Sequence, residues 1–158
     1  LQIMLPMISG VSEVDELKML IQRAHDELLE EGYAVSMPPI GVMIEVPSAV
    51  YMIEELARRV DFVSVGTNDL VQYIFAADRN NQAIDGDYSY DNEIFWNLLQ
   101  RLVVTAGEKG TPLSVCGEMA SNPATIPRLR ELGVRSVSAS PRLIPAVRRA
   151  AESAERTV

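Results

Sequence analysis

The sequence predicts an α/β protein built on a parallel β-sheet. Short runs rich in apolar and β-branched residues alternate with longer segments of helical period, the pattern of successive β–α units. With 158 residues, 47% of them hydrophobic and 23% charged, the chain is long enough for one core. No run approaches the roughly 20 apolar residues needed to cross a bilayer, so we expect a globular chain with no membrane partner.

Five strands are predicted, and each is followed by a change of pattern that ends it. They lie at residues 2–7, 40–46, 61–66, 112–116 and 134–138. Such a chain can fold as an open doubly wound sheet or as part of a barrel, and both place ligands beyond the carboxyl ends of the strands.

The segment between the first two strands predicts a helix with one apolar face. Ser12 and Asp15 resemble a capping box at its start, and Gly32 stands where a helix would stop. The residues of the apolar face are Val14, Leu17, Ile21, Ala24 and Leu28.

Further helices are predicted from proline positions and apolar spacing, with one long loop from Asp78 to Asp91 between them. They run from Pro47 to about Arg59, from near Asp91 to Gly110, from Asn122-Pro123 onward with a bend or a lost hydrogen bond at Pro127, and from Ile144-Pro145 to a polar end.

Charge and cysteine content restrict the partners. The net charge of −8 argues against a general binder of phosphate backbones, so we expect no nucleic-acid partner. The single cysteine, Cys116, cannot form an internal disulfide, and the first residues lack the features of a secretion signal, which favours a cytoplasmic location. Because the chain starts at Leu1 within a strand-like run, we expect it to be a piece of a longer protein.

Polar residues follow three of the predicted strands. Glu45 ends one strand, Asn68 and Asp69 follow the next, and Cys116 and Glu118 end a third. A buried carboxylate is costly unless it is paired or bound to metal, so acids that converge on one edge indicate a cation site. Two carboxylates without histidine suit magnesium better than zinc.

Each of these residues also has a purely structural interpretation. Asp69, after Gly-Thr-Asn, could cap a helix. Glu45 could be a buried ion-pair partner, and Cys116 could be a small core residue. It is their joint placement at strand ends that favours a functional site.

Three motifs carry a resemblance to a known family: GVMIEVPSA, VDFVSVGTNDLVQYIFAADRNN and PLSVCGEMASNP. They closely resemble the phosphoenolpyruvate-binding domain of enzyme I of the bacterial phosphotransferase system, most of all its nitrogen-related branch. The resemblance runs from Leu1 to about Ala150. It implies that residues 1–158 are the C-terminal part of a single (β/α)8 TIM-barrel domain, with roughly its last five strands.

The resemblance also implies roles for five residues. Glu45 and Asp69 match the two magnesium ligands of the family. Asn68 and Arg79 match residues that hold the substrate phosphate, and Cys116 matches the acid that protonates the enolate to give pyruvate.

The implied partners lie outside this sequence. The family passes the phosphoryl group of phosphoenolpyruvate to a histidine on a separate N-terminal domain, and then to an HPr-like phosphocarrier protein. That histidine and two further substrate arginines are missing here, so we expect no phosphoryl transfer by this chain alone. A homo-oligomer is expected because the barrel domain of the family dimerises and a five-stranded piece has open edges. The alternatives are an inactive oligomerisation or binding module, and a fragment of pyruvate phosphate dikinase or phosphoenolpyruvate synthase.

Overall fold

The computed structural model describes residues 1–77 and 90–155 of the chain. All five predicted strands form, each shorter than expected at one or both ends, and they build one parallel sheet in the order of the sequence. The strands are β1 (Ile3–Leu5), β2 (Ile40–Ile44), β3 (Phe62–Gly66), β4 (Leu113–Cys116) and β5 (Ser136–Ser138). The predicted α/β class is confirmed.

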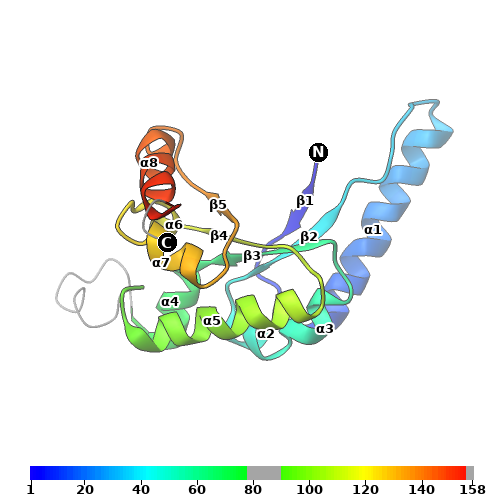
Figure 1. Ribbon diagram of the computed structural model, residues 1–158. Helices are drawn as coiled ribbons and strands as arrows, with labels where there is room; N and C mark the ends of the chain where they lie inside the picture. Colours follow the sequence, from blue (N-terminus) through cyan, green and yellow to red (C-terminus); the bar gives the residue numbers. More distant parts are fainter. Residues whose placement is uncertain (78–89, 156–158) are drawn as a thin grey trace.

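Helices connect the strands, as a parallel sheet requires. They are α1 (Val11–Glu30), α2 (Pro47–Tyr51), α3 (Ile53–Ala57), α4 (Thr67–Phe75), α5 (Glu93–Glu108), α6 (Glu118–Ser121), α7 (Ile126–Glu131) and α8 (Ile144–Glu155). In Figure 1, α2 to α5 lie below the sheet as drawn, α1 flanks its β1–β2 end, and α7 and α8 flank β5.

The predicted capping box of Ser12 and Asp15 is wrong. The N-cap of α1 is Gly10, two residues before Ser12, and the helix begins at Val11. The carboxylate of Glu13 reaches back and accepts hydrogen bonds from the backbone N–H groups of Ser9 (2.7 Å) and Gly10 (3.1 Å). Glu13 therefore satisfies two free donors at this helix start, and these bonds, above all that from Ser9, lower its pKa.

Two other helix predictions need correction. The helix expected from Pro47 to Arg59 is interrupted at Met52, which separates α2 from α3. The helix expected at Asn122-Pro123 begins only at Ile126, so Pro127 lies in its first turn, where its missing N–H costs no hydrogen bond. The short helices α4 and α6 directly follow β3 and β4 and were not predicted.

α1 is packed against the sheet along only part of its length. Val14 is fully buried and Leu17 and Ile21 pack on the core, but the outer half of the helix projects beyond the sheet (Figure 1). Of the predicted face, Ala24 and Leu28 are exposed. Other large apolar residues exposed in this region are Met19, Leu20, Leu29 and Tyr33.

The two faces of the sheet differ in chemistry. Side chains alternate along each strand, and the residues that face the helices are fully buried. These are Val42, Ile44, Val63, Val65 and Val115. The opposite face is mixed: it carries Met43 and Phe62 together with small and polar residues, among which Ser64 pairs in register with Ser114, and Gly66 with Cys116.

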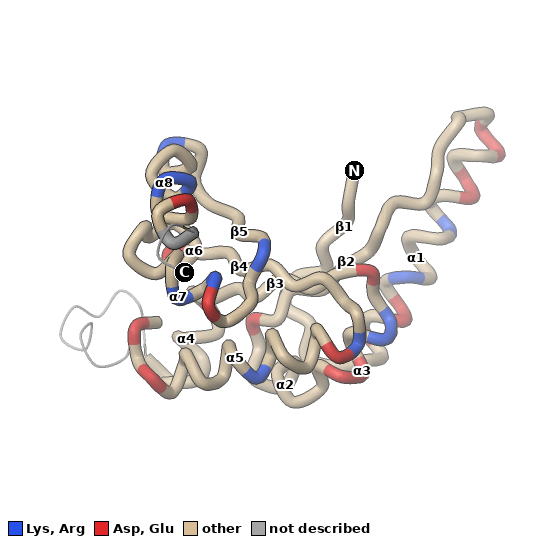
Figure 2. Tube along the Cα trace, viewed as in Figure 1, with Lys and Arg blue, Asp and Glu red and all other residues tan. Residues whose placement is uncertain are grey.

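Charge is distributed unevenly over the molecule (Figure 2). Residues 128–149, next to β5, contain six arginines and one glutamate. α1, at the opposite end, contains six acidic residues and two basic ones. The two ends of the sheet are therefore flanked by segments of opposite charge. Within the described segments, no helix has the length and apolarity that crossing a membrane requires.

Candidate functional site

The candidate site lies where β2, β3 and β4 end. Glu45 directly follows β2, Asn68 and Asp69 lie in the first turn of α4 after β3, and Cys116 is the last residue of β4. Because the strands are parallel and Gly66 pairs with Cys116, these ends meet at one edge of the sheet. This is the edge at which β/α proteins bind ligands.

Glu45 is the most buried acid of this group, with 4% of its surface exposed. Its Oε1 accepts a hydrogen bond of 2.8 Å from the backbone N–H of Met7, just beyond β1. Among the described residues it has no ion-pair partner, so the structural interpretation of Glu45 as half of a salt bridge finds no support there. A buried carboxylate with one hydrogen bond and no cation fits the ligand set of a metal ion.

Thr67 and Asn68 tie the end of β3 to the end of β4. The fully buried Thr67 donates its hydroxyl to the carbonyl of Cys116 at 2.7 Å, and Asn68 Oδ1 accepts from the N–H of Glu118 at 2.9 Å. Gly117, between them, has φ of +98°, and a Cβ there would lie 2.4 Å from Thr67 Oγ1. Only glycine fits this position.

Thr67 and Gly117 are site residues that sequence reasoning missed. Both stand inside the motifs GTND and CGE, which is the one signal that could have drawn attention to them. Their contact joins positions about 50 residues apart, so it depends on the register of β3 against β4.

Cys116 is half-buried, and its thiol donates to the carbonyl of Val65 at 3.4 Å. The pKa of Cys116 is raised mainly by burial of the thiol, and the negative charges of Glu45 and Asp69 raise it further. A hydrogen bond with Ser64 has the opposite effect and lowers this pKa in part. The thiol therefore stays protonated at neutral pH, as expected of a proton donor.

Asp69 is half-buried and is not the N-cap of α4, which is Gly66. It makes no ion pair within the described part of the chain. Arg79, the remaining predicted site residue, lies outside the described residues, as does most of the predicted loop from Asp78 to Asp91. Residues 1–77 and 90–155 contain no cluster of three or more metal-binding side chains, so Glu45 and Asp69 would hold a cation only together with other oxygen ligands.

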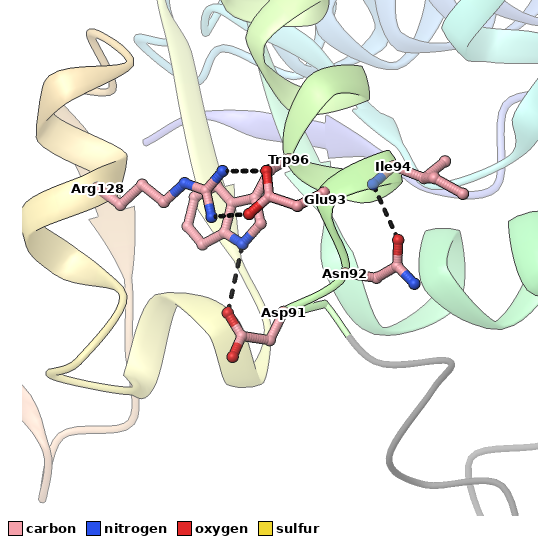
Figure 3. A network of polar contacts seen from close by, with 6 residues as sticks. All are labelled: Asp91, Asn92, Glu93, Ile94, Trp96 and Arg128. Atoms are coloured by element: carbon pink, nitrogen blue, oxygen red, sulfur yellow. Dashed lines mark hydrogen bonds and ion pairs between the residues drawn. The ribbon is translucent and has the colours of Figure 1, made fainter.

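A second polar network, which the sequence did not reveal, lies beside this edge of the sheet (Figure 3). Arg128 of α7 forms two hydrogen bonds with Glu93 of α5, of 2.7 and 2.6 Å, and its guanidinium lies 4.3 Å from the centroid of the Trp96 ring. Asp91 accepts from the Trp96 indole at 3.5 Å. Arg128 lowers the pKa of Glu93. The network connects α5 to α7 and encloses one side of a cavity of about 540 Å³ that reaches Glu118.

The parallel sheet and its helices define a β/α-barrel type of fold, and the candidate site lies at the carboxyl ends of its strands. A family model described as "PEP-utilising enzyme, PEP-binding domain" matches residues 1–156, and the chain belongs to this family.

Curated relatives agree with the family. The chain is 44% identical, over 94% of its length, to a protein of Salmonella typhimurium named "Phosphoenolpyruvate-dependent phosphotransferase system", and 45% identical over 91% to one of Escherichia coli with the same name. It is 38% identical over 89% to the phosphoenolpyruvate-protein phosphotransferase of Geobacillus stearothermophilus. The chain spans only 20%, 19% and 24% of these relatives.

Solved structures support the fold alone. A citrate lyase from Burkholderia xenovorans superposes with a TM-score of 0.71 at 22% identity, over 95% of this chain and 48% of that chain. The citrate lyase β subunit from M. tuberculosis gives 0.64 at 15% identity, over 95% and 60%. The sheet is thus part of a TIM-barrel-like architecture, as the resemblance implied.

Proposed function

We propose that this chain is the phosphoenolpyruvate- and magnesium-binding part of a phosphoenolpyruvate-protein phosphotransferase. The complete enzyme would pass the phosphoryl group of phosphoenolpyruvate to a histidine on another of its domains and on to an HPr-like phosphocarrier protein, releasing pyruvate. The family match and the names of the curated relatives support this proposal.

The observation that carries the proposal is the state of Glu45. It is buried next to a strand end, accepts one hydrogen bond, and has no positive partner among the described residues. An ionised carboxylate in such a place is costly without a cation, and phosphoenolpyruvate is itself an anion that needs positive charge.

Glu45 and Asp69 would hold magnesium, and Asn68 and Arg79 would hold the substrate phosphate. Magnesium supplies positive charge that offsets the charge on the phosphoryl oxygens, the main demand of phosphoryl transfer. Asn68 is suited to this role because its Oδ1 is already engaged by the N–H of Glu118, which fixes the orientation of the amide and leaves its NH₂ group to donate.

Cys116 would act on the other product. Loss of the phosphoryl group leaves an enolate, and the Cys116 thiol gives its proton to the enolate carbon to form the methyl group of pyruvate. The thiolate then takes a proton from water. Burial, which raises the pKa of the thiol, keeps the required proton on sulfur before the reaction.

Calorimetric titration of phosphoenolpyruvate into the protein, with and without magnesium, tests the proposal. We expect binding only with magnesium, and a loss of about 10- to 100-fold in affinity for Asp69→Asn, which removes the charge but keeps the shape. Glu16→Gln, an exposed change on α1, is the matched control and should bind as the parent does. Absence of binding at millimolar ligand, or binding that ignores both magnesium and Asp69→Asn, would contradict the proposal and favour a structural module.

A further inference from the structure

A groove lies between α5 and the pair α2–α3, on the surface of the helical layer. Its volume is about 700 Å³, within the range of pockets that bind small molecules. It lies over the middle of the described sheet, because α2 and α3 connect β2 to β3 and α5 leads into β4 (Figure 1). None of the described residues of the candidate site lines it, so the groove is a separate feature of the molecule.

One part of the groove is apolar. Ile53 and Leu102 are buried at its base, while Tyr51 and Ile94 remain 85% and 61% exposed. Ile94 extends from α5 on the side away from Arg128 (Figure 3). Single exposed apolar residues are ordinary, but these two line the same concave surface. A ligand in the groove would therefore remove both from water.

Positive charge is in excess along the rest of the groove. Glu54 lies between two cations, 3.6 Å from Arg58 Nη2 and 3.3 Å from Lys109 Nζ. The other acid of the lining, Glu55, faces a cation of its own at 3.9 Å. Arg101 has no acidic partner among the described residues. The groove therefore complements an anion rather than a cation.

The apolar and positive parts are separated by a defined length of α5. Ile94 and Arg101 lie about 10 Å apart along the helix axis. Asn97 and Thr105, one turn to either side of Arg101, also line the groove and supply polar groups. A ligand that satisfies both parts has an extended apolar body with a negative group at one end.

We propose that this groove binds a linear apolar carboxylate. The chain lies against Tyr51 and Ile94, where removal of apolar surface from water stabilises the complex. The carboxylate accepts hydrogen bonds from the guanidinium of Arg101, whose planar fork matches its two oxygens. This site goes beyond the proposed function and does not depend on it.

A nuclear magnetic resonance titration with sodium octanoate, without phosphoenolpyruvate or metal, tests the inference. We expect the amide signals of residues 50–58 and 94–105 to shift and to give a dissociation constant. Affinity should rise about three- to fourfold with each CH₂ group in the series butanoate, hexanoate and octanoate. 1-Octanol and octylamine share the chain but lack the negative charge, so both should bind more weakly.

Two variants separate the contributions of charge and of apolar contact. Arg101→Gln removes the charge, so it should weaken octanoate about 10-fold and leave 1-octanol unchanged. Ile94→Gln removes apolar surface at an exposed position, so it should weaken both ligands alike, about 3- to 10-fold. Arg148→Gln on α8 is the matched control, because this exposed arginine does not line the groove, and we expect its affinity to equal that of the parent.

Several results would overturn the inference. They are no binding of octanoate at millimolar concentration, equal binding of octylamine, an unchanged affinity in Arg101→Gln, and shifts confined to other parts of the chain. Signals of the groove that move with protein concentration alone would mean that a second copy of the chain occupies it, which would also overturn the inference. None of these results bears on phosphoenolpyruvate binding, so the proposed function stands or falls by its own titration.

Discussion

At the scale of single residues, the site depends on hydrogen bonds that cross from one strand end to the next. Thr67 is buried under the Cys116 carbonyl, and Cys116 points its thiol back at Val65. Cys116, whose thiol would protonate the enolate, is therefore held by one hydrogen bond to its backbone carbonyl and by another from its thiol.

Removal of the Thr67 hydroxyl tests this arrangement. In Thr67→Val, which keeps the shape of the side chain, the buried carbonyl of Cys116 loses its donor, and we expect a loss of about 1–3 kcal/mol in the free energy of unfolding. Urea denaturation measures it. Thr67→Ser keeps the hydroxyl and should keep the rate at which Cys116 is alkylated in the folded protein, whereas Thr67→Val should change that rate. A valine variant with the stability and the alkylation rate of the parent would contradict this role.

The pKa of Cys116 makes stability depend on pH in the alkaline range. Because folding raises this pKa above its ordinary value of 9.0, the folded state favours the protonated thiol, and the resulting stabilisation is complete below that pH. It is lost as pH rises from about 9 toward the folded pKa. We expect the difference in unfolding free energy between the parent and Cys116→Ala to shrink over this range in urea titrations. A constant difference up to pH 11 would contradict the raised pKa.

At the scale of elements, α5 and α7 are joined by a planar ion pair stacked on an indole. Arg128 and Glu93 are exposed to solvent, which screens their charges, so the pair itself should contribute little to the free energy of unfolding. We expect a double-mutant cycle on Arg128 and Glu93 to give this coupling and to lose it in high salt. Arg128→Lys should lose most of it, because lysine cannot form both hydrogen bonds.

The pair Arg23–Glu27 on α1 is the comparison, since both of its side chains are more than half exposed. Its coupling should be about 0.3–0.5 kcal/mol, as for other pairs one helical turn apart. A coupling between Arg128 and Glu93 no greater than this would mean that neither the paired geometry nor Trp96 adds anything.

Sequence reasoning predicted the five strands, and it placed Glu45, Asn68, Asp69 and Cys116 together at the carboxyl ends of those strands. Both predictions were possible because the strands follow one another in chain order and their side chains alternate with a period of two. Sequence reasoning failed where contacts between distant parts of the chain determine the local backbone conformation. The break at Met52 and the left-handed backbone of Met7 have no local signal, since methionine is not a turn residue. The roles of the predicted site residues remain predictions.

At the scale of the whole molecule, the described sheet has two open edges, β1 and β5, and the segments beside them differ in charge. Strand edges recruit other chains, and opposite charge would bring the basic β5 end of one copy to the acidic α1 end of another.

We therefore expect head-to-tail self-association that grows with protein concentration and weakens with salt. Sedimentation velocity at several concentrations and ionic strengths measures it. Ser136→Glu, which puts a negative charge on the exposed and otherwise basic β5 end, should shift the protein toward monomer, whereas the neutral change Ser136→Gln should not. A monomer at every concentration, or association that salt strengthens, would contradict this arrangement.

The overhang of α1 has a consequence for how the protein melts. Twenty residues of helix are about 30 Å long, and only the inner turns are held by the core and by the bond from Lys18 to the Arg59 carbonyl. The outer turns must obey the helix–coil equilibrium of a peptide, in which short helices in water are marginal. On heating, the outer turns of α1 should therefore fray before the core unfolds, and the helical circular dichroism signal should fall gradually as they do. The slope of the signal before the main transition would then report fraying within the native protein.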